Sequence, residues 1–323
     1  MENTNKCAGS RLKLVFGDVV LGVHGTEFNY LFSYQTGGLE SLVVKGREWL
    51  YRTPKPTFWR ATTDNDRGNG FPFRSAMWMG ADMFIQTVGI RIWADGKEVR
   101  RFKAPYNNRF GGPVQAETCA IQYRYRTATR PAAEVTVTYT VEAGGRIQVK
   151  TRYKGKKGLP QLPAFGLRFI MPTAADSYDY CGLSGETYPD RMAGGVKGSY
   201  HVDGLPVTPY LVPQECGMHM ETQRVTINRS QSLDHIRPDG ESFALSFEAE
   251  ERPFAFSCLP YTAQELENAT HQEELPPVRR TVLCIYGAVR GVGGIDSWGS
   301  DVEPAYHIDG SAALEFAFAI RPQ

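Results

Sequence analysis

The sequence has almost no excess charge, because its 323 residues hold 36 lysines and arginines against 35 aspartates and glutamates, for a formal net charge of +1. This balance, without any long basic run, argues against nucleic acid and against a membrane surface as partners. The chain also lacks an apolar run of transmembrane length, and its first residues do not have the basic-then-apolar layout of a signal peptide. We therefore expect a cytoplasmic protein.

Motifs for metals and cofactors are missing as well. The six cysteines lie far apart and include no C-x-x-C pair, which is unlike a zinc site or a disulfide framework. The six histidines show no i, i+4 pairing, and the glycine-rich stretch 287–294 lacks the spacing of a dinucleotide or phosphate loop. The residues therefore predict no metal and no cofactor in this chain.

What the sequence does contain is many short segments in which apolar and polar residues alternate. The alternation runs over 134–142, the chain turns at two glycines (144–145), and the alternation resumes at 147, a pattern typical of a hairpin. Helical signals are few: apolar spacing over 73–84, and Thr262 three residues before Glu265 as a capping box. We expect one all-β domain over residues 1–323, a large antiparallel sandwich with few short helices.

The stretch FWRATTDNDRGNG (58–70) concentrates polar groups beside two aromatic residues. As a calcium loop it would need its third ligand at Gly68, its turn glycine at Asn69 and a glutamate at Ser75, so the pattern fails at all three positions. We interpret Asp64, Asn65 and Asp66 as caps and anchors that satisfy backbone donors around an irregular loop.

Several acids come close to the pattern of a glycosidase site without completing it. A glycosidase needs two carboxyl groups about 5–9.5 Å apart across one sugar ring. The sequence shows no such pair among the candidate acids, which are Glu186, Asp190, Glu215, Glu265, Glu267, Glu273 and Glu274. Asp190 precedes Arg191, which favours an ion pair that holds a loop. We expect structural roles for these acids.

One tryptophan stands in a glycine-rich segment between two apolar strands, GVGGIDSWGSDV (291–302). Glycines there allow conformations that present Trp298 outward, and an exposed indole offers an apolar plate for the C–H face of a sugar. The alternative is an ordinary tryptophan that packs its own loop. The residues alone leave both interpretations open.

Five segments in fixed order resemble the C-terminal domain of β-galactosidases of the lactose-operon type, glycoside hydrolase family 2. They are FWRATTDNDRG, GETYPDR, PYLVPQECG, YTAQELENATH followed by ELPP, and GVGGIDSWG. The resemblance covers nearly the whole chain. Some enzymes of this family are split into two chains, and this sequence is similar to their small subunit. It implies a β-supersandwich of the galactose-mutarotase-like class.

The resemblance also implies roles for the site residues and a partner. The catalytic glutamates of the family lie in a TIM barrel, which here would belong to a β-galactosidase large subunit, so no catalytic residue is expected in this chain. Trp298 would stack under a β-galactoside such as lactose. An active-site lid would start at Gly68 and run through Asn69 and Gly70. The lid would be anchored by the preceding polar residues, which are Arg60, Asp64, Asn65 and Asp66. Any Mg²⁺ or Na⁺ would be bound by the partner.

Three further expectations stay beside this one. The chain could be a free-standing galactose-binding module, or an aldose-mutarotase-like protein, which would need a histidine and a glutamate on one concave face.

Thr62 stands where many relatives have proline, which predicts a softer hinge. The apolar residues of MWMGADMF form either an interface patch or a cover of the core. They are Met77, Trp78, Met79, Met83 and Phe84.

Overall fold

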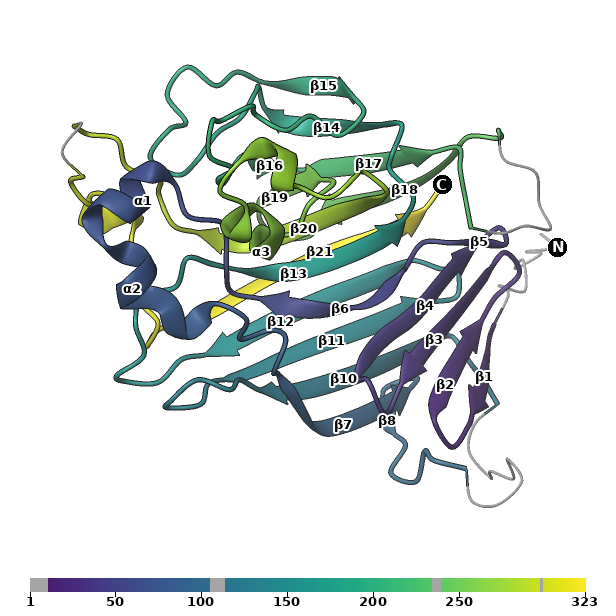
Figure 1. Cartoon of the computed structure of the whole chain (residues 1–323). Coiled ribbons are helices and arrows are strands. Elements are labelled where there is room, and N and C mark those ends of the chain that lie inside the picture. The colour runs from purple at the N-terminus through teal and green to yellow at the C-terminus, as the bar shows by residue number, and fades with distance from the viewer. Residues whose placement is uncertain (1–10, 105–113, 234–239, 297–298) are drawn as a thin grey trace, which may run out of the picture.

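The computed structural model describes residues 11–104, 114–233, 240–296 and 299–323. Within them the chain forms three sheets and a few short helices (Figure 1). Neighbouring strands run antiparallel, as in the hairpin that the alternation over 134–149 predicts. The expected all-β architecture of large antiparallel sheets is therefore confirmed.

The three sheets differ in size. The largest has ten strands, in the order β15 (Lys197–Asp203), β14 (Ser177–Leu183), β17 (Arg224–Arg229), β18 (Phe243–Ala249), β21 (Ala313–Pro322), β12 (Ile147–Lys154), β11 (Glu134–Glu142), β10 (Thr118–Arg126), β7 (Gln86–Ala94) and β8 (Lys97–Glu98). A six-stranded sheet has the order β5 (Arg47–Glu48), β4 (Gly38–Val44), β3 (Phe28–Ser33), β2 (Val20–His24), β1 (Leu12–Phe16) and β9 (Gln115–Ala116). A five-stranded sheet has the order β16 (Met218–Thr222), β19 (Phe254–Leu259), β20 (Arg280–Val289), β13 (Ala164–Pro172) and β6 (Arg52–Thr57).

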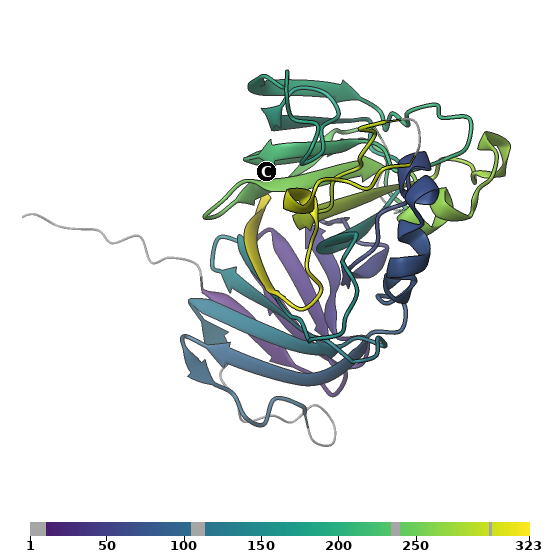
Figure 2. The same ribbon diagram turned by 90° about the vertical axis from the view of Figure 1, so that its left-hand side faces the viewer.

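Both smaller sheets pack on the same face of the ten-stranded sheet. Tyr139, Val149 and Phe318 lie opposite one another in adjacent strands, so their side chains share one face. Phe32 of the six-stranded sheet contacts Tyr139, with ring centroids 5.6 Å apart. Phe169 of the five-stranded sheet contacts Phe318 at 6.1 Å. The result is a sandwich in which one broad sheet is covered by two smaller ones (Figures 1 and 2).

The helices are short and lie in connections between strands. They are α1 (Asp64–Asn69), α2 (Phe71–Ser75) and α3 (Ala263–Asn268), with the 3₁₀ turns η1 (Ala76–Trp78), η3 (Gln272–Glu274) and η4 (Pro304–Tyr306). No helix in the described ranges is long and apolar enough to cross a membrane. The expected capping box is confirmed at α3, where Thr262 and Glu265 bond each other's backbone.

Two expectations about helices need correction. Residues 73–84 were expected to be one helix, but α2 ends at Ser75, a 3₁₀ turn follows, and Gly80 turns the chain with a φ of +70°. Residues 64–69 were expected to be an irregular loop, but they form α1. These helices follow β6 and lie together at one end of the molecule (Figure 1).

Candidate functional site

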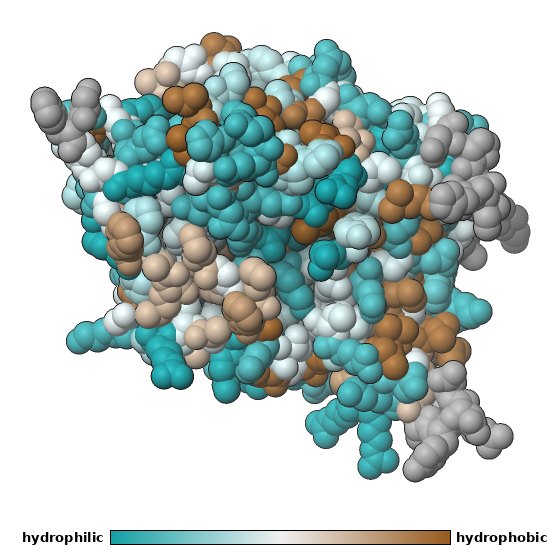
Figure 3. Space-filling view, in the orientation of Figure 1, coloured by the Kyte–Doolittle hydropathy of each residue, from teal (hydrophilic) through white to brown (hydrophobic). Residues whose placement is uncertain are grey.

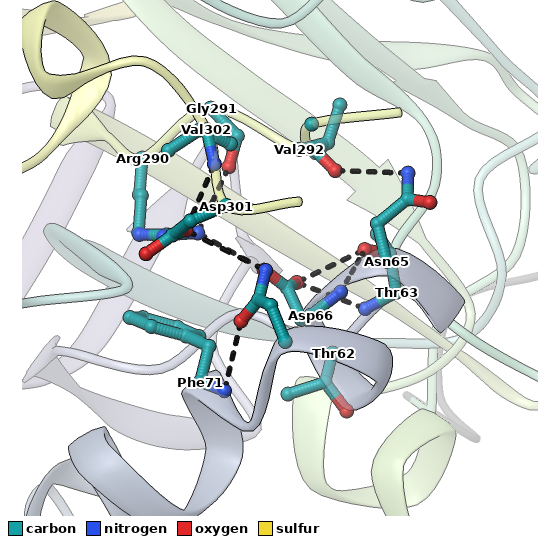
Figure 4. Close-up of polar contacts among 12 residues, drawn as sticks. Thr62, Thr63, Asn65, Asp66, Phe71, Arg290, Gly291, Val292, Asp301 and Val302 are labelled. Carbon is teal, nitrogen blue, oxygen red and sulfur yellow. Dashed lines mark hydrogen bonds and ion pairs between the residues drawn. The ribbon is translucent and has the colours of Figure 1, made fainter. Parts of the chain in front are cut away.

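The site is built on the start of α1. The Thr63 hydroxyl accepts a hydrogen bond from the Asp66 backbone N–H at 3.2 Å, and the Asp66 carboxylate accepts one from the Thr63 N–H at 3.0 Å. This reciprocal capping box satisfies two of the free donors at a helix N-terminus. Because aspartate replaces the usual glutamate, its short side chain is held close to the backbone (Figure 4).

Asp66 lies between two buried arginines that come from distant parts of the chain. Arg60 Nη1 donates to one carboxylate oxygen at 2.6 Å, and Arg290 Nη1 donates to the other at 3.0 Å. The side chains of both arginines are fully buried and that of Asp66 is 1% exposed. Burial alone would raise the pKa of Asp66, but the two guanidinium groups outweigh it and hold the pKa below its usual value.

Asp301 extends this network from the core to the surface. It accepts hydrogen bonds from Arg290, from Arg74 at 2.9 Å and from the Asn69 side-chain amide at 3.5 Å. The Arg290 guanidinium also stacks over the Phe71 ring, 3.8 Å from its centroid. One carboxylate therefore connects Arg290, which directly follows strand β20, with the C-terminal end of α1 (Figure 4) and with Arg74 of α2.

A second set of bonds fixes the segment that follows Arg290. Asp190 accepts the backbone N–H groups of Val292 at 3.0 Å and Gly293 at 2.8 Å. The Asn65 side-chain amide donates to the Val292 carbonyl at 3.2 Å. The expected Asp190–Arg191 ion pair is wrong, because the Asp190 carboxylate binds backbone amides while Arg191 donates to the Gly293 carbonyl. Both residues still hold a loop, as the sequence predicts.

Two glutamates support the segment between β6 and α1. Glu215 accepts the Ala61 N–H at 3.1 Å, and burial raises its pKa to about 8, although Arg60 acts in the opposite direction. Glu267 accepts the Thr62 N–H and the Thr62 hydroxyl, each at 2.7 Å. Proline could donate neither bond, so Thr62 adds two attachments at the position where we expected a softer hinge.

The expected lid residues adjoin the tryptophan loop. Gly68 and Asn69 close α1, and Gly70 ends it with a φ of +75°. A Cβ atom on Gly299 would lie 2.9 Å from the Gly68 carbonyl carbon, so only a glycine allows this approach. Trp298 itself lies outside the described residues, and its place under a sugar stays a prediction.

The structure therefore brings together most of the residues that the sequence suggested. Arg60, Asn65 and Asp66 bond the segments that they were expected to anchor. Asp64 is on the surface: its side chain is 74% exposed and pairs with Arg67 at 3.2 Å. Its backbone N–H donates to the side chain of Gln214 at 2.9 Å.

Two residues that carry the network were not predicted. Arg290 directly precedes the glycine-rich segment 291–302 and Asp301 lies near its end, and their charges beside glycines were the only available signal. Glu267 was among the acids expected to have structural roles, and it accepts the backbone N–H of Thr62 from α3. Among the described residues, no group of three histidine, cysteine, aspartate or glutamate side chains is placed to hold a metal ion.

The fold and the site together define an all-β domain that holds α1 beside the segment that starts at Arg290. The carboxylates of the site are used in structural bonds. The chain matches the family described as β-galactosidase small chain over residues 24–320. It is 59% identical to a β-galactosidase small subunit of Latilactobacillus sakei, with 99% of each chain covered. The chain thus belongs to the β-galactosidase small chain family, as the resemblance indicated.

Longer relatives contain the same domain as one part. A β-galactosidase of Halalkalibacterium halodurans is 34% identical over 97% of this chain, which spans 28% of that relative's length. A β-galactosidase of Streptococcus thermophilus is 32% identical over 96% of this chain, again 28% of the relative. A solved putative aldose 1-epimerase of Escherichia coli K12 aligns over 98% of this chain at 11% identity with a TM-score of 0.44, which is too weak to support a conclusion.

Proposed function

We propose that this chain is the non-catalytic small subunit of a heteromeric β-galactosidase of glycoside hydrolase family 2. In this proposal it completes the active site of a TIM-barrel large subunit that hydrolyses terminal β-D-galactosides such as lactose. Hydrolysis would retain the anomeric configuration, through a galactosyl intermediate on a glutamate of the large subunit. Any Mg²⁺ or Na⁺ would be held by that subunit.

The observation that carries the proposal is the buried bond between Asp66 and Arg290. Through it the α1 segment and the segment that bears Trp298 are held as one unit, so both would reach a partner's active site together. The carboxylates around this unit are engaged in structural bonds: Asp66 with arginines, Glu215 with Ala61 and Glu267 with Thr62. This arrangement suits a domain that positions binding groups and leaves bond cleavage to its partner.

In this unit, Gly68, Asn69 and Gly70 would form the moving part of a lid over the partner's site. Arg60, Asn65 and Asp66 would form its fixed base. Closing a segment over bound substrate excludes water from the reaction and commits the substrate. Trp298 would supply a flat apolar surface for the sugar's C–H face.

A mutarotase-like reaction receives less support from the structure. It needs a histidine and a glutamate together in an open concave face. The most buried described histidine, His219, bonds the Tyr178 hydroxyl at 3.1 Å and the Gly185 carbonyl at 2.8 Å, so both ring nitrogens are engaged. Burial lowers its pKa to about 4. These bonds give His219 a structural role.

The proposal is tested by Trp298→Ala in the assembled enzyme. Loss of the indole should remove about 1–3 kcal/mol of substrate binding, seen as a roughly 5- to 150-fold fall in kcat/KM. Steady-state kinetics at saturating small subunit measure this change. Trp298→Phe is the matched control, since it keeps an aromatic plate and should recover part of the loss. Wild-type kcat/KM in Trp298→Ala would contradict the proposed role.

A further inference from the structure

A cluster of exposed apolar side chains follows directly after α1. Fourteen large apolar residues are exposed in the described part of the chain, and five of them fall within residues 73–84. These five are between 41% and 87% exposed and are called the apolar face here: Phe73, Met77, Met79, Met83 and Phe84. Figure 3 shows apolar side chains gathered on the side of the molecule that carries α2 in Figure 1. Such clustering on a folded domain marks a contact surface.

The apolar face is mounted on a rigid base. Trp78, for which the sequence left an interface patch and a cover of the core both open, is fully buried and stacks on Phe58 with ring centroids 5.4 Å apart. Its indole N–H donates to the Pro160 carbonyl at 3.1 Å, and the Ser75 hydroxyl donates to the Gln161 carbonyl at 2.9 Å. The exposed side chains are therefore held outward by a packed segment.

Two connections between strands lie near the base of the apolar face. The Arg130 backbone N–H contacts the Met77 sulfur at 3.4 Å, which places the turn between β10 and β11 beside η1. Lys156 and Lys157 are exposed in the connection that leads to Pro160, the residue bonded by the Trp78 indole. A partner surface that complements the apolar face would be apolar at its centre and polar at its edge.

We propose that the apolar face is the surface through which this chain docks onto the β-galactosidase large subunit. The inference rests on the proposed function. The chain spans only 28% of its longer β-galactosidase relatives, so the domain in them is continuous with a much larger remainder. The apolar face also adjoins the α1 segment, which has to reach the partner's active site. Phenylalanine and methionine suit such a contact, because they bury large areas and adapt to irregular surfaces.

The test compares the double variant Phe73→Ser/Met83→Ser with the wild-type chain. The probe is the purified large subunit of the Latilactobacillus sakei enzyme, with that enzyme's own small subunit as the positive control. Affinity is measured by biolayer interferometry, and the mass of each isolated chain by sedimentation velocity. Val15→Ser is the matched control, because Val15 is 46% exposed and lies on β1, at the opposite side of the molecule from α2 in Figure 1.

We expect the double variant to raise the Kd at least about tenfold, while Val15→Ser leaves it unchanged and both variants melt within a few degrees of the wild type. If the wild-type chain binds and the double variant binds with the same Kd, the apolar face is not the docking surface, but the proposed function remains intact. The proposal is also overturned if the wild-type chain self-associates and the double variant lowers its mass to that of a monomer without changing the Kd for the large subunit. Failure of the wild-type chain to bind, with the positive control active, contradicts the proposed function and the inference together.

Discussion

At the residue scale, one carboxylate determines how the candidate site is held. Asp66 supplies the negative charge for two buried guanidinium groups that lie more than two hundred residues apart in sequence. A buried ion pair contributes little net stability, since the cost of removing its charges from water offsets the attraction. Removal of one partner is different, because it leaves an uncompensated charge in the interior. The network therefore specifies one arrangement of the two segments more than it stabilises the fold.

Asp66→Asn should accordingly destabilise the domain strongly. The amide keeps the shape of the carboxylate but leaves Arg60 without its charge partner, so the free energy of unfolding should fall by about 3–5 kcal/mol. Urea denaturation of the isolated chain measures this change. Asp64→Asn is the matched control two residues earlier: its side chain is 74% exposed and its pair with Arg67 should contribute at most about 1 kcal/mol. Equal losses in the two variants would refute the role of Asp66.

The sequence predicts part of this network. Aspartate and asparagine within a short polar stretch indicate caps and anchors from local chemistry alone, which is why Asn65 and Asp66 could be assigned. Arg290 and Asp301 could not be assigned, because their roles depend on tertiary contacts with residues near position 66. A charged side chain next to glycines is equally typical of an exposed loop, and only the fold buries Arg290.

At the element scale, α1 shows how a cap overrides propensity. Its six residues include aspartate, asparagine and glycine, which are weak helix formers, so the sequence favours a loop. The Thr63–Asp66 capping box satisfies free backbone donors at the start of α1, and the arginines that bind Asp66 fix the position of this turn. Strands were easier to predict, because alternation over 134–149 depends only on which face is buried. The 73–84 segment has helical spacing, but α2 ends at Ser75, the 3₁₀ turn that follows buries Trp78, and Gly80 then turns the chain with a φ of +70°.

The contact between α1 and the tryptophan segment can be tested at Gly299. Gly299→Ala places a Cβ atom 2.9 Å from Gly68, so α1 must move. We expect faster hydrogen exchange at the backbone amides of Arg67 and Gly70, measured by mass spectrometry, and a lower kcat/KM in the assembled enzyme. In the wild-type chain the Arg67 N–H donates to the Thr63 carbonyl and the Gly70 N–H donates to the Arg67 carbonyl.

Gly185→Ala is the matched control for this experiment. Gly185 has a φ of +68°, similar to the +82° of Gly299, but a Cβ atom there would meet nothing within 4 Å. Both variants should lose about 1–2 kcal/mol of stability from the left-handed backbone conformation. Only Gly299→Ala should change exchange in α1, and the same exchange pattern in both variants would contradict a specific contact.

At the scale of the whole molecule, the sandwich brings α1, the tryptophan segment and the apolar face to one end. The two smaller sheets cover one face of the ten-stranded sheet, and the connections after β6 and β20 meet where α1 packs against residues 290–292 and 299–301. Each of these parts was visible in the sequence as a separate pattern. Their position at one end of the fold was not, because it depends on strand order. In our proposal, this end of the molecule would contact the larger subunit.

The measurement that tests this account most directly is hydrolysis of a chromogenic β-galactoside by the chain, by the Latilactobacillus sakei large subunit and by their mixture. The account predicts negligible activity for this chain alone and activity in the mixture that rises with added chain until a defined ratio is reached. Activity of the isolated chain would mean that it holds a catalytic pair of its own. A mixture no more active than the large subunit alone, while that enzyme's own small subunit restores activity, would contradict the claim that this chain completes a partner's active site.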